Sequence, residues 1–400
     1  MESNELHEFL IRTGTLLHRY GTPSHRLERV MTQIARSLGV EGVFLYTPTA
    51  LVISITDEGG ECTYLRRVDS GSIDVDKLIR FDETLEELEA RTITLAQAAR
   101  QLECIATDPP PYPDWVTILA CSVSCAAVAV FFRGNPLEIV FSACIGLFVA
   151  ILETLHARRG WEQGFLEPVT GFLSAVAALA IARFIVPIDD RLVTLAGLIV
   201  MIPGLKLTIA LTELAVGHLS AGVARLAGAC VSLLTITVGV AIGWRIAGSW
   251  RNLPVPTTWH LPDWSQWLAI LIAPIAFSIV FKARWRVWPT ITAVSTAGFL
   301  ASITCGRIWG IEVGAFCGAL VVGIGSNLYA RTVNRPALVP LTPGIIVLVP
   351  GSLGYRSLTA FLDRQTMVGI DFAFNMIIVA IALVGGILTA NALLPPKRIL

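Results

Sequence analysis

The sequence is poor in charged residues for its length. Only 15% of its 400 residues are Asp, Glu, Lys or Arg, and 54% are hydrophobic, whereas a soluble domain carries about a quarter of charged residues. Too little polar surface is therefore available to cover a water-soluble globule of this size. The formal net charge is zero and no Lys/Arg run is long enough to follow a phosphate backbone, which argues against a nucleic-acid partner. The composition indicates a membrane protein.

Motifs of redox, metal and nucleotide chemistry are also missing. The eight cysteines form no CxxC pair and fall mostly in apolar stretches, so we interpret them as small buried hydrophobic residues. No GxxxxGK[ST] loop is present, which argues against an ATP-driven pump. The first residues, MESNELHEFL, contain no basic segment followed by an apolar run, so we expect no cleaved signal peptide. We predict neither a cofactor nor a metal site.

Charge is distributed unevenly along the chain. Residues 1–114 hold 11 basic and 19 acidic residues, and the remainder holds 19 basic and 11 acidic residues. This split predicts an acidic soluble domain followed by a hydrophobic body with basic loops. We place a cytoplasmic α+β domain, called the head below, at residues 1–113. The body is divided into membrane repeats at 114–252 and 253–400.

The head shows helical and β patterns in alternation. Apolar spacing predicts helices over 5–20, from Ser24 to about 38, and over about 74–90 and 94–105. Ser24 is the expected N-cap of the second helix. Two β-rich runs, 43–56 and 61–68, flank a turn at 57–60.

The head offers few groups for catalysis. We interpret them as surface residues, because no nucleophile, phosphate-loop or zinc motif surrounds them, and we predict no enzyme. These groups are His7, His18, His25, Glu28 and Cys62.

The body contains ten stretches long and apolar enough to cross a bilayer, which takes about 20 residues of helix. The predicted spans are 115–132, 137–155, 168–186, 191–212, 223–247, 265–281, 288–305, 309–330, 338–359 and 371–394.

The fourth and ninth spans each contain an interior Pro-Gly, at Pro203-Gly204 and Pro350-Gly351. Proline and glycine break helices, and the sequence around the two breaks aligns. Glu167 and Glu312 open the helices that precede the broken spans. The body is therefore expected to be a duplication of five helices. An odd number of spans per unit inverts the second copy, as in many secondary transporters, in which broken segments point to the substrate site.

A broken helix frees backbone N–H groups that suit a carboxylate. We expect Lys206, Ser352 and Arg356 to add donors, and Thr208 or Asn327 to meet a substrate hydroxyl. The predicted substrate-binding residues are Pro203, Gly204, Lys206, Thr208, Asn327, Pro350, Gly351 and Ser352. Charges inside spans are usually functional, so Glu213, Glu153 and His218 are the candidates for proton coupling.

The chain resembles the threonine/serine exporter family. The resemblance is carried by GTLLHRYGTPSHRLERVMTQIARSLG and FLYTPTALVIS in the head, by MIPG, and by VPLTPGIIVLVPGSLGYRSL near the C-terminus. It implies a cytoplasmic N-terminal domain, ten spans, and export of small hydroxylated amino acids driven by the proton gradient. In relatives the two halves can occur as separate chains.

We therefore expect a proton-coupled exporter of threonine or serine in the inner membrane, with both termini in the cytoplasm. Its partners would be the amino acid, protons and the lipid bilayer. Export of another small carboxylate such as a dicarboxylate, a channel, a membrane-tethered enzyme or sensor, and assembly into a homo-oligomer remain open.

Overall fold

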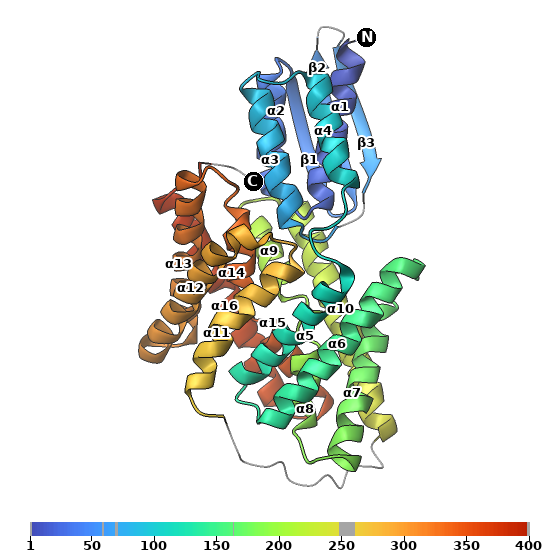
Figure 1. The fold of residues 1–400 in the computed structure, drawn as a ribbon, viewed down its shortest axis with the longest axis vertical. Helices are drawn as coiled ribbons and strands as arrows, with labels where there is room; N and C mark the ends of the chain where they lie inside the picture. The colour runs from blue at the N-terminus through green and yellow to red at the C-terminus, as the bar shows by residue number, and fades with distance from the viewer. Residues whose placement is uncertain (1, 58–59, 69–70, 163, 248–260, 398–400) are drawn as a thin grey trace.

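The computed structural model describes residues 2–57, 60–68, 71–162, 164–247 and 261–397. A head of four helices and a small sheet stands on one end of a helical body (Figure 1). The predicted boundary between the two repeats, at 252/253, lies outside the described residues.

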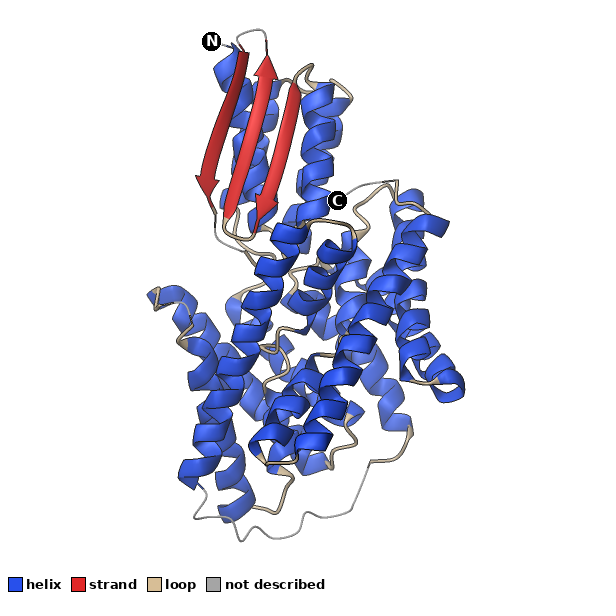
Figure 2. Ribbon diagram, turned by 180° about the vertical axis from the view of Figure 1, so that it is seen from behind, coloured by secondary structure: helices blue, strands red, loops and turns tan. Residues whose placement is uncertain are grey.

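The head is built on a three-stranded antiparallel sheet of order β1-β2-β3, formed by Glu41–Thr47, Ala50–Asp57 and Gly60–Arg67. The run predicted over 43–56 divides into two strands because Pro48 and Thr49 form the turn between them. Four helices cover one face of the sheet, and the other face is bare (Figure 2). These helices are α1 (Glu2–Arg19), α2 (Ser24–Ser37), α3 (Val75–Glu89) and α4 (Leu95–Thr107).

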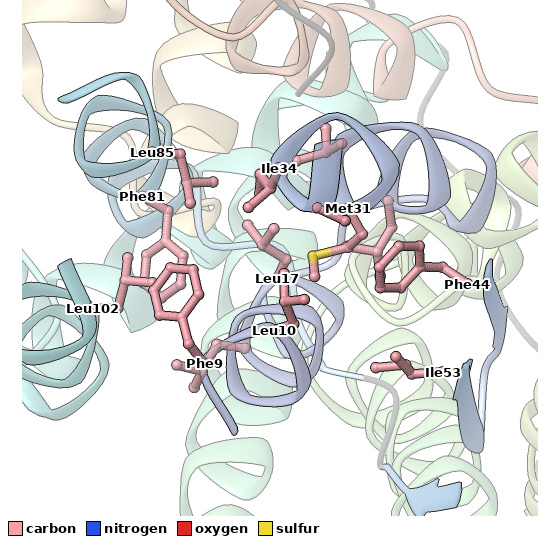
Figure 3. Packing of buried hydrophobic residues seen from close by; sticks show 14 of the residues in the cluster. Phe9, Leu10, Leu17, Met31, Ile34, Phe44, Ile53, Phe81, Leu85 and Leu102 are labelled. Carbon is pink, nitrogen blue, oxygen red and sulfur yellow. The ribbon is translucent and has the colours of Figure 1, made fainter. Parts of the chain in front are cut away.

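Apolar side chains from all four helices and the sheet meet in one core (Figure 3). The alternation of β2 explains the geometry, because Leu51, Ile53 and Ile55 point inward and are almost completely buried. The other core members in the close view are Phe9, Leu10, Leu17, Met31, Ile34, Phe44, Phe81, Leu85 and Leu102.

Two sequence interpretations need correction. His7 and His18 are 4% exposed rather than surface residues, because their faces of α1 pack toward the strands. The interpretation of the cysteines as buried holds for Cys121 and Cys125 but is wrong for the exposed ones, which are Cys62, Cys104, Cys144 and Cys230. The exposure of Cys62 agrees with its interpretation as a surface residue.

The body consists of helices that run up and down between two ends. Within the described residues, eight helical segments are long and apolar enough to cross a membrane. The other two predicted spans correspond to α11, which has 17 residues, and to the pair α8 and α9, which a break separates. The first half comprises α5 (Asp114–Phe131), α6 (Pro136–Arg159), α7 (Leu166–Phe184), α8 (Asp190–Gly197), α9 (Gly204–Ala215) and α10 (Leu219–Ile246). The second comprises α11 (Trp264–Val280), the 3-10 turn η2 (Trp285–Val287), α12 (Trp288–Trp309), α13 (Ile311–Thr332), α14 (Leu338–Ile346), α15 (Gly351–Leu362) and α16 (Thr366–Leu393).

Helix boundaries in the two halves repeat at a fixed spacing. α9 and α10 begin at residues 204 and 219, and α15 and α16 begin 147 residues later, at 351 and 366. The ends of these helices keep the same spacing. Packing repeats as well: α7 lies against α10 as α13 lies against α16, and α6 lies against α8 as α12 lies against α14.

Exposed tryptophans mark both ends of the body. Trp115, Trp161 and Trp285 lie at the helix ends nearest the head, and each exposes 38% or more of its surface. Trp264, Trp267 and Trp309 lie at the opposite end and expose 59% or more. Such rings favour the membrane–water interface, so these positions indicate two membrane boundaries with the head outside the hydrocarbon.

Glycines allow the closest helix contacts. A Cβ on Gly239 of α10 would lie 2.1 Å from the Pro168 carbonyl oxygen of α7, and one on Gly314 would lie 2.5 Å from the Ser302 oxygen of α12. Gly318 of α13 allows the same close approach to α12, because its added Cβ would lie 2.9 Å from the Ser302 Cβ.

We expect Gly239→Val to separate α7 from α10 and to lower the free energy of unfolding by at least about 1–3 kcal/mol, the usual cost of overpacking. Gly228→Val on the same helix is the matched control, because a Cβ there meets nothing within 4 Å. Thermal unfolding in detergent should show a lower Tm for Gly239→Val only. Equal melting of both variants would contradict this packing account.

Candidate functional site

The two Pro-Gly breaks meet in the interior of the body. α8 ends at Gly197 and α9 begins at Gly204, while α14 ends at Ile346 and α15 begins at Gly351. A Cβ placed on Gly351 would lie 3.0 Å from the Gly204 Cα, and one on Gly204 would lie 2.2 Å from the Val349 Cγ1. The backbones of the two breaks are therefore in van der Waals contact, and no larger residue fits at either glycine without movement.

Proline determines where each new helix starts. Pro203 and Pro350 are the residues that precede α9 and α15, with φ, ψ of −78°, 40° and −81°, 20°. Their carbonyls accept the first helical bonds, from the Leu207 amide at 3.0 Å and the Gly354 amide at 3.3 Å. The first turn of a helix has N–H groups without an intrahelical acceptor and a partial positive charge. Two such ends therefore face one crossing point.

The predicted side chains around the crossing differ in their surroundings. Pro203, Gly204, Pro350 and Gly351 are buried, and Ser352 is half-buried. The hydroxyl of Thr208, also buried, donates to the Gly204 carbonyl at 3.3 Å.

A second polar group lies beside α9. The Lys206 side chain is exposed, and with His156 and Glu167 it is one of the charged groups that act on Glu153 of α6. Glu167 at the start of α7 accepts a hydrogen bond from the Ser232 hydroxyl of α10 at 3.3 Å. Lys206 and Glu153, both exposed, are therefore within electrostatic reach of each other.

Two predicted polar residues point elsewhere. The Asn327 amide of α13 donates to the Asn391 side chain of α16 at 2.9 Å, so it bonds across helices. The Arg356 guanidinium lies 4.9 Å from the centre of the Phe132 ring and does not face the break.

Glu213 joins the body to the head. Its carboxylate is fully buried, pairs with Arg225 of α10 at 3.0 Å, and accepts a hydrogen bond from the Ser24 amide at 2.9 Å. α2 has Pro23 as its N-cap and no side-chain cap of its own, so the expectation that Ser24 is the N-cap is wrong. Glu213, which belongs to the body, supplies the acceptor that this helix end needs.

His218 of the body also contacts α2 of the head. Its Nδ1 lies 3.3 Å from a Glu28 carboxylate oxygen, and its ring centre lies 6.1 Å from that of His25. α2 of the head is thus held by Glu213 and His218 of the first half of the body, and Arg225 of the same half pairs with Glu213. The assignment of Glu213 and His218 to proton coupling stays a prediction, but their partners are those of a junction.

The second half holds α3 of the head. The Val75 amide donates to the Phe281 carbonyl at 3.0 Å, Lys282 pairs with Asp74 at 3.3 Å, and Arg284 pairs with Asp76 at 2.6 Å. Beyond these, Arg335 pairs with Glu83, and Asn334 donates to Glu86 at 2.8 Å. The head is therefore attached to both halves by separate sets of polar contacts.

Two family models match the chain in consecutive parts. One, described as a threonine/serine exporter, matches residues 8–247, and another, described as "Threonine/Serine exporter, ThrE", matches residues 266–393. The chain belongs to the threonine/serine exporter family. It is a membrane protein of this family, and the interval between the two matches falls between α10 and α11.

Curated relatives of this exporter-family chain include fungal proteins named "Pheromone-regulated membrane protein 10". The one from Eremothecium gossypii is 26% identical over 93% of this chain and 52% of its own length. The one from Kluyveromyces lactis is 24% identical over 97% and 43%, and the one from Saccharomyces cerevisiae 24% over 88% and 47%. The chain thus spans about half the length of these relatives. No solved structure matches it.

The sequence did not reveal the hydrogen-bond and ion-pair partners of Glu213 and Asn327. Ser24 and Asn391 had no motif that would identify them, because they lie 189 and 64 residues from their partners. Arg225 lies only 12 residues from Glu213 but belongs to the next helix. A partial signal existed for the junction: acidic residues concentrate in the head and basic residues in the loops of the body.

We expect Glu213→Gln to loosen the head. The change leaves Arg225 without its charge partner, and breaking a buried pair costs about 3–5 kcal/mol. Hydrogen–deuterium exchange at the first turn of α2 should rise by at least tenfold. Glu103→Gln is the control, because Glu103 pairs with Arg12 in an exposed contact within the head. Unchanged exchange at the first turn of α2 in Glu213→Gln would contradict the role of Glu213 in holding the head.

Acid should weaken the same junction through His25. Burial, then the charges of Arg26, His218, Arg29 and Arg225, lower the pKa of His25 from 6.5 to about 3. The unfolded chain therefore takes up a proton below pH 6.5 that the folded chain does not. This costs stability by at most about 1.4 kcal/mol for each pH unit below 6.5.

The difference in Tm between the wild type and His25→Asn should therefore shrink as the pH is lowered from 7.5 to 5. His156→Asn, near the exposed end of α6, is the control and should leave the pH dependence unchanged. A wild type and His25→Asn that follow parallel pH curves would contradict the assignment.

Proposed function

We propose that this chain is a secondary exporter of small hydroxylated amino acids such as threonine and serine, and that a proton gradient drives it. The observation that carries the proposal is the contact between Gly204 and Gly351. Family membership supports the direction and the substrate class.

We infer that the body consists of two inverted repeats of five spans each. The spacing of 147 residues and the recurring helix contacts support this arrangement, as does the division between the two family matches. With α8–α9 and α11 counted as spans, each half has five. Five is odd, so the second half enters the membrane from the opposite side, and α9 and α15 approach the crossing from opposite directions.

The α-carboxylate of the substrate would bind the freed amides of α9 and α15, with Lys206 in the first turn of α9 as the cation that pairs with it. The crossing is closed in this conformation, because the two glycines touch and Val349 fills the space beside them. Access therefore requires the two halves to separate at the breaks, and alternate opening toward each side of the membrane would move the amino acid across.

Glu153 is our first candidate for the proton-carrying group. Lys206 and Glu153 lie within electrostatic reach, so a substrate carboxylate that engages Lys206 would change the electrostatic surroundings of Glu153. Glu213 is the weaker candidate because Arg225 and Ser24 already hold its carboxylate.

We place the head and both termini in the cytoplasm of a cell whose inner membrane holds the body. Lys282, Arg284, Arg286 and Arg335 lie in head-side loops, and basic loops favour the cytoplasmic side.

We expect Gly351→Val to abolish efflux of labelled threonine from loaded vesicles while the protein still inserts, since a side chain at the crossing meets backbone. Gly228→Val should transport at the wild-type rate. Lys206→Gln should raise the KM for threonine by about tenfold, because a charge-assisted bond is worth about 1.5–3 kcal/mol. Efflux by Gly351→Val at the wild-type rate would exclude the crossing as the site.

We expect Glu153→Gln to uncouple transport from protons. In vesicles, a pH gradient should accelerate threonine efflux by the wild type and have no effect on the variant. Glu138→Gln is the control for a carboxylate away from the crossing: Glu138 accepts capping bonds from the Asn135 and Asp189 amides through its two oxygens, of which glutamine keeps one, so the variant should lose some stability but remain coupled to protons. Wild-type efflux that ignores the gradient would exclude proton coupling, and coupled Glu153→Gln would transfer the role to another residue.

A further inference from the structure

An apolar groove of about 730 Å³ opens between α11 and α12. Leu271 and Ile275 of α11 form one wall, and the residues from Trp285 to Leu300 form the other. The stretch from Trp288 to Leu300 covers about 18 Å of helix, slightly more than the roughly 15 Å of one leaflet of the hydrocarbon core. The groove therefore has the length of a lipid chain in the leaflet next to the head.

The corresponding helices of the first half leave no such space. A Cβ on Gly146 of α6 would lie 2.4 Å from the Cys125 sulfur of α5, and the Ser122 hydroxyl donates to the Ala143 carbonyl at 2.8 Å. α5 and α6 are thus closely packed where α11 and α12 diverge. The groove therefore breaks the symmetry between these two corresponding helix pairs.

Charge at the head-side end of the groove favours an anion. The segment Lys282–Arg286 carries three basic residues, of which Lys282 and Arg284 pair with carboxylates of the head. The guanidinium of Arg286 lies 5.9 Å from the ring centre of Trp285, which lines the groove. Among the described residues, no carboxylate lies within ion-pair distance of Arg286.

We propose that this groove binds one anionic phospholipid of the head-side leaflet, with an acyl chain along α12 and the phosphate on Arg286. Basic pockets between membrane helices on the cytoplasmic side suit such headgroups. Trp285 and Trp288, which line the groove, place its head-side end at the membrane interface. The same loop carries Lys282 and Arg284, so the bound lipid would lie next to the contacts that hold the head.

Native mass spectrometry of the full chain in mild detergent tests the proposal, with phosphatidylglycerol and phosphatidylcholine of identical chains as probes. The wild type should retain phosphatidylglycerol more tightly than phosphatidylcholine. Arg286→Gln should weaken phosphatidylglycerol binding by about fivefold, the worth of one basic residue near the membrane surface, and leave phosphatidylcholine unchanged. Ala297→Phe, which fills the groove, should reduce the binding of both lipids.

Arg159→Gln is the matched control. Arg159 is also exposed at the head side, with its guanidinium 5.6 Å from the ring centre of Trp161, but it does not line the groove. Equal retention of the two lipids by the wild type, equal effects of Arg159→Gln and Arg286→Gln, or unchanged binding in Ala297→Phe would each overturn the proposal. A photo-cross-linker at position 297 that joins two copies of the chain instead of a lipid would reassign the groove to a homo-oligomer.

Discussion

The rest of the structure depends on how two interrupted helices cross inside a hydrophobic body. Backbone groups at membrane depth need a hydrogen-bond partner or a polar cavity, so an unwound segment is expensive unless other protein covers it. Here each break covers the other, and only glycine at 204 and 351 allows that approach. Pro203 and Pro350 immediately precede α9 and α15, and the first turns of these two helices point to the same place. A carboxylate is the natural ligand for such a pair of ends.

The head is connected to both halves of the body, and therefore to the crossing, through separate sets of polar contacts. α2 rests on the first half through Glu213 and His218, and α3 rests on the second half through Lys282 and Arg284. A movement of one half against the other must strain one of these two sets of contacts. The head is therefore positioned to respond to a movement of one half of the body against the other, and the sheet face away from its helices (Figure 2) takes no part in these contacts.

Local patterns predicted most of the architecture. Apolar runs identified the eight helical segments that are long enough to cross a membrane among the described residues, with ends within about five residues, and the repeated Pro-Gly identified the two breaks that the structure brings together. What the sequence could not provide was the pairing of charges across long separations. Glu213 has the properties of a proton carrier when it is considered alone, yet Arg225 and the Ser24 amide occupy its carboxylate. The sequence likewise predicts that Asn327 binds the substrate hydroxyl, but in the structure its amide donates to the Asn391 side chain. Such partners follow from packing, which periodicity does not encode.

The most direct test of the crossing as a substrate site is hydrogen–deuterium exchange of the full chain in the presence and absence of threonine. The amides just after each break, at residues 205–206 and 351–352, should become protected together when threonine binds, because one carboxylate engages both helix ends; the Gly204 amide already donates to the Ile202 carbonyl at 2.8 Å. Protection confined to one break, or found only at distant segments while both breaks exchange as in the free protein, would contradict the account.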